Sequence, residues 1–343
     1  MSGENRLGLV RAAVARHGGA RLGRHPERLP MLFFNRDFEQ SDIILADVVH
    51  HFQGPGKDRS EWGFTWERLD RTMGQPRSAL LRDWSDLGRL RVPDPGDPER
   101  FAGLAETRAL YGERYYLGSL ALSGFTVMSC LRGFPELLAD LMERPRQTEA
   151  LADLVFGFEE EVLRLLPARG FHGAAFFDDW GTQDSLLLSP GLWRERFLPR
   201  YRRQFALAHG LGLDIYFHTC GQVTPLIPDL IAAGVDLLNL SQPNLFDLEQ
   251  LGARFAGQVC FVCPVSYQTT AISGSEADIR AEVARLVKHL ARNGGGLIGY
   301  VEEYQSIGLS EANYQACVRA FRELGGGPEW TRLTAPTPTA SSR

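Results

Sequence analysis

Residues 173–241 read GAAFFDDWGTQDSLLLSPGLWRERFLPRYRRQFALAHGLGLDIYFHTCGQVTPLIPDLIAAGVDLLNLS, and this stretch decides the fold. Three short apolar segments, GAAFF, LDIYF and VDLLNL, alternate in it with two segments of helical periodicity. Ser189 and Pro190 mark the start of the first helix, because serine caps a helix N-terminus and proline fits its first turn. Short apolar strands that alternate with helices are typical of a parallel sheet covered by helices.

The same alternation extends outward in both directions. Residues 1–25 predict a helix, LPMLFFN at Leu29–Asn35 predicts a first strand, and the regular rhythm runs from about residue 99 to residue 324. Six or more such units without a break in composition favour a closed (β/α)₈ TIM barrel of the α/β class over an open sheet. No Gly-x-Gly-x-x-Gly follows a strand, so the sequence does not indicate a dinucleotide-binding fold.

The domain boundaries follow from this pattern. We expect one barrel domain over residues 1–325 and a disordered C-terminal tail over residues 326–343, which are rich in Gly, Pro, Ser and Thr. Residues 50–76 are irregular and are predicted to fold over the barrel's cavity, with Trp62 and Trp66 as apolar walls.

Composition limits the class of protein. Apolar residues make up 44% and charged residues 23% of 343 residues, which is typical of a soluble globular protein, and no apolar run approaches the roughly 20 residues of a membrane span. The net charge of −5 gives no sign of a nucleic-acid surface. The sequence shows no signal peptide pattern, so we expect a cytoplasmic protein. Its five cysteines are an odd number, which argues against a disulfide framework and favours free thiols.

The active site of a parallel barrel lies at the carboxyl ends of its strands. Asp178 and Asp179 follow the strand GAAFF, and adjacent residues at a strand end point in different directions, so one of them is expected to reach the barrel mouth as a catalytic residue. The alternative is that these acids cap a helix or are simply solvated.

His218 and Cys220 end the next strand. Residues two apart on a strand point to the same side, so an imidazole and a thiol share one space, and Gly221 lets the chain turn. These are two of the best zinc ligand types. A lone His-x-Cys is a weak motif, and its position at a strand end is what favours a functional role.

Two further places carry reactive groups. Glu302 and Glu303 follow the strand LIGYV, where a buried acid pair needs hydrogen bonds or a metal, although an exposed loop is the alternative. Cys260 and Cys263 have a spacing found in redox and metal sites, but they lie within an apolar strand and are interpreted as ordinary buried cysteines. We expect the strand ends with Asp178 and Asp179, His218, Ser241 and Gln242, and Glu303 to open on one cavity.

A family resemblance runs through these residues. The stretch FFDDWGTQDSLLLSPGLWRERFLPRYRRQFALAHGLGLDIYFHTCGQVTPLIPDLIAAGVDLLNLSQP resembles the uroporphyrinogen decarboxylase superfamily. The similarity is strong from about Phe176 to Phe321 and weaker in EWGFTWERLDRTMGQP. That superfamily contains uroporphyrinogen decarboxylases and zinc-dependent methyltransferases that use methylated corrinoid proteins, and its fold is a (β/α)₈ barrel.

The decarboxylase branch carries an N-terminal motif of the form PxWxMRQAGR, whose arginines bind the carboxylates of the substrate. The matching stretch here is LPMLFFNRDFEQSD, in which only Arg36 could stand for one arginine. A tetrapyrrole with eight carboxylates needs several cations. The missing arginines therefore argue against the decarboxylase reaction.

The methyltransferase branch carries a His-x-Cys-Gly strand end, which His218, Cys220 and Gly221 match. Its third zinc ligand is a cysteine shortly after a Gly-Gly turn, and Glu303 takes that position here, with Glu302 as the substitute if the turn is shifted. Zinc accepts a carboxylate oxygen, so a site of His218, Cys220 and Glu303 is chemically sound.

The resemblance therefore implies a zinc enzyme that moves a methyl group between a corrinoid on a partner protein and a small thiol or methylated substrate. Asp178 or Asp179 would orient the substrate or a ligand. One alternative is a metal-free decarboxylase of uroporphyrinogen or a related acid. Another is a non-catalytic barrel that binds a corrinoid or tetrapyrrole. We expect neither nucleic acid nor a membrane as a partner.

Overall fold

The computed structural model describes residues 5–14, 26–49, 58–67, 74–291, 296–302 and 308–335. The chain divides into two compact units. The first consists of Met1–Ile44, Glu113–Tyr115 and Asp236–Arg343, and the second of Leu45–Gly112 and Tyr116–Val235. The prediction of a single domain stays a prediction.

Eight parallel strands form one sheet in the order β1-β10-β9-β8-β7-β6-β5-β2. With their helices they make the fold of an α/β barrel, which confirms the predicted fold class. The strands are β1 (Met31–Phe34), β2 (Ile43–Asp47), β5 (Tyr115–Leu122), β6 (Gly173–Phe177), β7 (Asp214–Thr219), β8 (Leu237–Leu240), β9 (Cys260–Cys263) and β10 (Leu297–Glu302).

The first unit holds β1, β8, β9 and β10 with the helices near both chain ends. Its longest helix begins with a capping box, because the Ser275 hydroxyl accepts from the Asp278 N–H while the Asp278 carboxylate accepts from the Ser275 N–H. The helices and short 3₁₀ turns are α1 (Arg6–Ala13), η1 (Phe38–Gln40), η7 (Pro243–Leu245), α9 (Leu248–Phe255), α10 (Thr270–Ser273), α11 (Glu276–Leu290), α12 (Glu311–Leu324) and α13 (Gly327–Thr334).

Helix α13 corrects the expectation of a disordered tail from residue 326. The Trp330 side chain is buried, and its indole N–H donates to the Pro26 carbonyl at 3.0 Å. The polar and Gly/Pro-rich composition suggested disorder, but this two-turn helix packs against α11 and α12 and buries one large aromatic side chain. Residues 336–343 lie outside the described residues.

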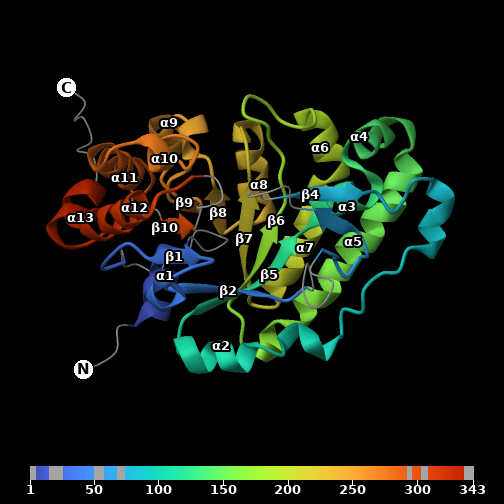
Figure 1. The fold of residues 1–343 in the computed structure, drawn as a ribbon, viewed down its shortest axis with the longest axis horizontal. Coiled ribbons are helices and arrows are strands. Elements are labelled where there is room, and N and C mark those ends of the chain that lie inside the picture. The colour runs from blue at the N-terminus through green and yellow to red at the C-terminus, as the bar shows by residue number, and fades with distance from the viewer. Residues whose placement is uncertain are drawn as a thin grey trace. The chain divides into compact units, whose positions relative to one another are not determined.

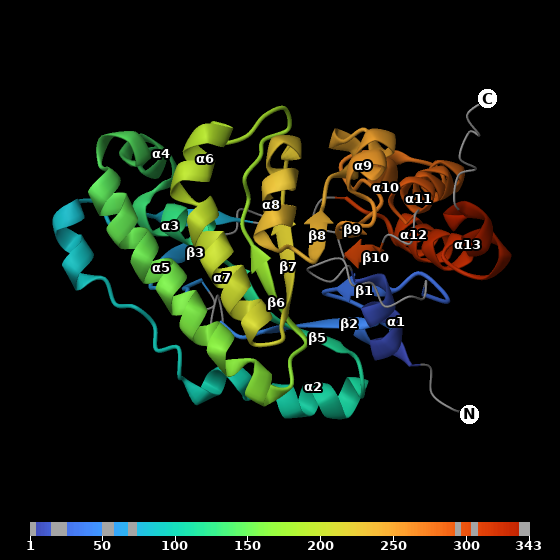
Figure 2. The same cartoon turned by 180° about the vertical axis from the view of Figure 1, so that it is seen from behind.

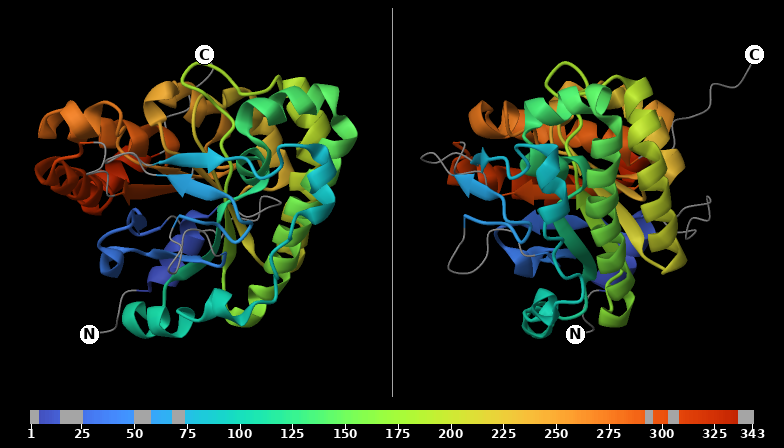
Figure 3. Two further views of the ribbon diagram at one scale, coloured as in Figure 1. Left: turned by 45° about the vertical axis from the view of Figure 1, so that its right-hand side comes forward. Right: turned by 90° about the vertical axis from the view of Figure 1, so that its right-hand side faces the viewer.

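The second unit holds most of β2 and β5, all of β6 and β7, and a separate antiparallel hairpin of β3 (Thr65–Glu67) and β4 (Gln75–Ser78). Helices α5 and α7 lie side by side in it, as Figures 1 and 2 show from opposite sides and Figure 3 from two more directions. Its helices and turns are η3 (Trp84–Arg89), η4 (Pro98–Phe101), α2 (Leu104–Tyr111), α3 (Gly124–Arg132), α4 (Phe134–Glu143), α5 (Pro145–Leu165), η5 (Pro167–Arg169), α6 (Pro190–Arg196), α7 (Leu198–Gly210), η6 (Thr224–Leu226) and α8 (Ile227–Ala233).

Helix α6 begins as the sequence predicts, since the Ser189 hydroxyl accepts from the Leu192 N–H at 3.2 Å and Pro190 occupies the first turn. None of the helices in the described part of the chain is long and apolar enough to cross a membrane.

The two faces of β6 and β7 have different partners. Phe176 and Phe217 both pack against the Phe205 ring of α7, with ring centroids 5.4 and 6.0 Å away. Side chains alternate along a strand, so Phe177 and His218 point to the opposite, inner face, where their rings lie 5.0 Å apart. The helices thus cover one face of these strands and leave the other for the site.

Candidate functional site

Two loops meet where β6 and β7 end. The Asp178 N–H donates to the His218 carbonyl at 3.1 Å, and the Gly181 N–H donates to the Cys220 carbonyl at 3.1 Å. The Trp180 N–H donates to the Thr219 hydroxyl at the same distance. These bonds continue the pairing of the two strands past their ends, so residues 178–181 lie directly beside residues 218–220.

Two glycines allow this close approach. Gly221 has a φ of +83°, and a Cβ built on it would lie 2.2 Å from the carbonyl carbon of Gly181. A Cβ on Gly181 would in turn lie 2.7 Å from the Gln222 nitrogen. Neither loop has room for a side chain at the crossing, and only glycine adopts the backbone angle of Gly221 without strain.

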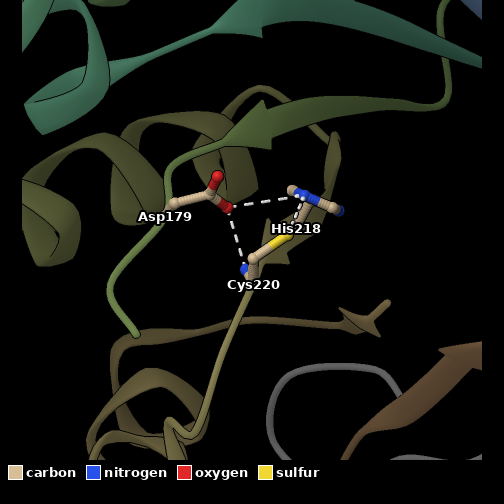
Figure 4. A group of neighbouring side chains, drawn as sticks. All are labelled: Asp179, His218 and Cys220. Carbon is tan, nitrogen blue, oxygen red and sulfur yellow. Dashed lines mark hydrogen bonds and ion pairs between the residues drawn. The ribbon is translucent and has the colours of Figure 1, made fainter. Parts of the chain in front are cut away.

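The crossing brings three potential metal ligands together, which Figure 4 shows. The Cys220 Sγ and the His218 Nε2 lie 3.5 Å apart, and the His218 Nε2 lies 3.5 Å from the Asp179 Oδ1. All three ligand atoms lie within 4.8 Å of one another. The Cys220 N–H donates to the Asp179 Oδ1 at 2.8 Å, which holds the carboxylate beside the other two groups.

The three side chains are partly open to solvent. The side chain of His218 is 16% exposed and that of Asp179 is 50% exposed. Cys220 is partly exposed, whereas the other four cysteines are buried. A metal and a substrate therefore have access to the cluster, and Cys220 is the one cysteine of the five that is not buried.

Asp178 has a different environment from its neighbour. Its carboxylate is fully buried and accepts hydrogen bonds from the N–H groups of Phe125 and Thr126, the Thr126 hydroxyl and the Tyr201 hydroxyl, at 2.9, 2.8, 2.9 and 2.5 Å. Burial raises the pKa of Asp178 to about 8, although the four donors act in the opposite direction. Asp178 thus caps the N-terminus of α3, and Asp179 is the acid of the pair that lies beside His218 and Cys220.

A second buried carboxyl completes the cap of α3. Glu159 on α5 accepts from the Gly124 N–H at 2.7 Å and from the Gln204 side-chain amide at 2.7 Å. Burial raises the pKa of Glu159 to about 7. Because Asp178 and Glu159 satisfy the first N–H groups of α3, this helix end is fixed directly beside the site.

Asp47, which the sequence reasoning missed, faces the same side of the sheet as His218. Its side chain is hydrogen-bonded to Ser119 of β5. In the sheet register, Ser119 lies opposite Ala175 of β6, and Ala175 lies opposite Tyr216 of β7. Paired residues point to one face, and Tyr216 and His218 are two residues apart on β7. Desolvation raises the pKa of Asp47 although solvent still reaches its side chain. The apolar run IILA that ends at this acid was the available signal.

The other residues that the sequence predicts for the site follow β8 and β10. Glu303 lies outside the described residues, and the Glu302 carboxylate accepts from the Tyr300 hydroxyl at 2.6 Å. Ser241 and Gln242 follow β8 and are buried, so whether they share a cavity with the other strand ends stays a prediction.

Two further interpretations from the sequence concern the pair Cys260 and Cys263 and the pair Trp62 and Trp66. Cys260 and Cys263 are both buried in β9, which confirms their interpretation as ordinary buried cysteines. Trp62 is buried and packs edge-on against Phe158 of α5 at 5.3 Å, whereas Trp66 is partly exposed in β3. Residues 50–57 and 68–73 lie outside the described residues, so the cover that residues 50–76 were predicted to form stays a prediction.

Comparison with known proteins places this chain in a family. The sequence profile described as uroporphyrinogen decarboxylase (URO-D) matches residues 70–324, which is more than half of the chain. The chain belongs to the uroporphyrinogen decarboxylase family. No curated protein sequence matches it.

Among solved structures, a methyltransferase from Methanosarcina mazei shares the fold, with a TM-score of 0.62 and 17% identity over 77% of this chain and 76% of that one. A xylanase of glycoside hydrolase family 10 from Gloeophyllum trabeum (12% identity, 64% and 80% of the two chains) and a chitinase from Chromobacterium violaceum (10%, 85% and 98%) reach TM-scores of only 0.38 and 0.41. Those two similarities are too low to support an argument.

One residue bears on which branch of the uroporphyrinogen decarboxylase family this chain represents. The Arg36 guanidinium makes two hydrogen bonds to the Glu311 carboxylate, at 2.6 and 2.8 Å, and lies 4.3 Å from the centre of the Tyr314 ring. Arg36 lowers the pKa of Glu311 to about 2. The one arginine that could match the decarboxylase motif is therefore already paired with a carboxylate of the chain.

Proposed function

We propose that this member of the family is a zinc-dependent methyltransferase that moves a methyl group between a corrinoid protein and a small thiol or methylated substrate. The observation that carries the proposal is the cluster of Asp179, His218 and Cys220, whose ligand atoms lie within 4.8 Å of one another. Three protein ligands and one open position are typical of catalytic zinc, whereas structural zinc is usually held by four protein ligands.

The residues present fit zinc. A thiolate, an imidazole nitrogen and a carboxylate oxygen are all usual zinc ligands, at about 2.0–2.3 Å. Ligands at those lengths around one tetrahedral ion lie roughly 3–4 Å from one another. The two distances of 3.5 Å from His218 Nε2, to Cys220 Sγ and to Asp179 Oδ1, meet this requirement. Glu303, the carboxylate that the family resemblance implies, stays a proposed ligand in the place of Asp179.

Zinc in this site would act as a Lewis acid that stabilises a thiolate, which is the nucleophilic form of a thiol acceptor at neutral pH. The chain's own groups prepare the site for it. The Cys220 N–H orients the Asp179 carboxylate toward His218. His218 and Cys220 must both be deprotonated to bind a metal, so metal uptake releases protons and strengthens as the pH rises.

The corrinoid partner rests on the family resemblance. The match of His218, Cys220 and Gly221 to the methyltransferase strand end supports it.

The decarboxylase reaction is the second candidate, and Asp47 favours it. Desolvation raises the pKa of Asp47, and a carboxyl group on the same face of the sheet as His218 is a candidate general acid for the carbanion left by loss of CO₂. The pairing of Arg36 with Glu311 speaks against it, because eight substrate carboxylates need several available cations. We therefore place methyl transfer first.

The test combines metal content with methyl transfer. We expect the purified protein to hold about one zinc per chain. We also expect it to transfer methyl groups from methylcobalamin to at least one of a panel of small thiols, and the visible spectrum of the corrinoid monitors this reaction. Cys220→Ala should lose both properties and keep the wild-type melting temperature. Asp184→Asn, an exposed acid in the same loop as Asp179, is the matched control and should keep both.

The alternatives predict different results. A wild-type protein without zinc that decarboxylates a porphyrinogen would replace the proposal with the decarboxylase reaction. Binding of cobalamin or a tetrapyrrole without turnover, unchanged in a variant that lacks the side chains of Asp179, His218 and Cys220, would indicate a non-catalytic barrel. Retained zinc and retained methyl transfer in Cys220→Ala would refute the assignment of the ligands.

A further inference from the structure

The Thr126 hydroxyl on α3 touches both acids that follow β6. It donates to the Asp178 Oδ1 at 2.9 Å, and it accepts from the Asp179 N–H at 3.3 Å. A hydroxyl has one proton to donate and two lone pairs, so both bonds can exist at once. Thr126 is therefore a direct link between the buried carboxylate and the backbone of the proposed metal ligand.

The Asp178 side of this link is rigid. The Tyr201 hydroxyl donates to Asp178 and accepts from the Trp180 indole N–H at 3.0 Å, and all three of these side chains are fully buried. The Trp180 ring also stacks on Phe125 of α3, with centroids 4.6 Å apart. The residues on both sides of Asp179 are thus held by packing and hydrogen bonds.

The Asp179 side is less constrained. Half of its side chain is exposed, and within the described part of the chain the Cys220 N–H and the His218 ring are the neighbours that orient its carboxylate. An exposed aspartate side chain exchanges between rotamers, and the backbone decides which rotamers are allowed and where they place the carboxylate. The position of its Cα, which the Thr126 bond restrains from the side of α3, therefore decides whether Oδ1 stays beside His218.

We propose that Thr126 is a positioning residue of the metal site, which sets the backbone of Asp179 so that its carboxylate completes the ligand set with His218 and Cys220. The inference rests on the proposed function, because it takes Asp179 as a zinc ligand. Groups that orient metal ligands typically contribute a factor of about 10–100 to metal affinity.

The experiment measures zinc affinity by competition with a chromophoric chelator. Thr126→Val removes the hydroxyl at nearly constant volume and leaves both N–H donors of α3 to Asp178, so the helix cap remains. We expect its Kd for zinc to rise roughly ten-fold, whereas Thr126→Ser should stay near wild type. Thr182→Val is the control, because that hydroxyl in the same loop bonds only within its own turn.

A double-mutant cycle separates positioning from general stability. If Thr126 acts through Asp179, Thr126→Val should change the zinc affinity of an Asp179→Asn protein by less than about two-fold. The visible spectrum of the Co²⁺-substituted protein gives a second readout, since loss of a carboxylate ligand alters the cobalt bands independently of activity. If Thr126→Val does not fold, Thr126→Ala replaces it in the same cycle, and Thr126→Ser remains the conservative control.

The outcomes are distinct. Unchanged zinc affinity in Thr126→Val, or an equal loss in the Asp179→Asn background, overturns the positioning role while the zinc site of the wild type stands. A wild-type protein without measurable zinc affinity overturns both this inference and the proposed function. If Thr126→Val lowers zinc affinity when Asp179 is present but not in the Asp179→Asn protein, the positioning role is supported.

Discussion

Replacing Gly221 with alanine tests the loop crossing that assembles the site. The new Cβ would lie 2.2 Å from the Gly181 carbonyl carbon and 2.3 Å from its oxygen, where ordinary contacts begin at 3.4 Å. The two loops must separate by about 1 Å to accommodate it. Such overpacking costs roughly 1–3 kcal/mol, and the left-handed φ of +83° adds about 1–2 kcal/mol for a residue with a Cβ.

Gly212→Ala supplies the matched control. Gly212 also has a positive φ, +77°, but a Cβ there meets no atom within 4 Å, so only the backbone term of about 1–2 kcal/mol applies. Urea denaturation of the metal-free proteins should therefore show Gly221→Ala as less stable than Gly212→Ala by roughly 1–3 kcal/mol. The difference isolates the contact between the loops from the strain of the backbone.

The same substitution should weaken metal binding. Separation of the loops moves Cys220 away from Asp179, whose Oδ1 accepts from the Cys220 N–H at 2.8 Å. We expect the zinc Kd of Gly221→Ala to rise about 10–100-fold and that of Gly212→Ala to stay unchanged, both measured by chelator competition. Equal stabilities of the two variants together with wild-type zinc affinity in Gly221→Ala would refute the role of the crossing.

Three further predictions concern single residues. Glu303→Gln should lower zinc affinity, as the family resemblance implies; unchanged affinity by chelator competition would leave Asp179 as the carboxylate ligand. Glu159 has a folded-state pKa of about 7 against 4.5 in the unfolded chain, so its contribution to stability is complete below pH 4.5 and is lost as the pH rises through 7. Urea titrations should show this fall, of the order of 3 kcal/mol, and Glu159→Gln should remove this part of it, while the part due to Asp178, whose pKa is raised to about 8, remains; an unaltered slope would contradict the assignment. Trp330→Ala should destabilise the protein by about 3–5 kcal/mol in thermal unfolding, because the indole of α13 is buried, whereas a negligible change would return residues 327–334 to the predicted tail.

Local sequence patterns were sufficient for the strands and helices around the site. GAAFF and LDIYF are short apolar runs that form β6 and β7, and the Ser189-Pro190 pair starts α6 where it was expected. These features depend on neighbours within a few residues, so a sequence shows them directly. Composition was less reliable for the C-terminal segment, where one buried tryptophan outweighed a polar, Gly/Pro-rich surrounding.

Asp47 shows a limit of the same reasoning. It ends the apolar run IILA, which lies just before the irregular segment 50–76, and the run was not recognised as a barrel strand. Its relation to His218 depends on the pairing of β5, β6 and β7, through Ser119, Ala175 and Tyr216. Strand register of this kind joins residues far apart in the chain and cannot be inferred from local periodicity.

The sequence by itself determined that His218 and Cys220 share a space, because side chains two apart on a strand point to one side. It also limited the two acids after β6 to opposite directions, without deciding which of them faces the site. Only the tertiary structure decided that Asp178 caps α3 and that Asp179 lies beside His218 and Cys220. The physical reason is that both outcomes depend on contacts between distant segments: the packing of α3 and α7 around one carboxylate, and the crossing of two loops at glycines that leave no room for a side chain.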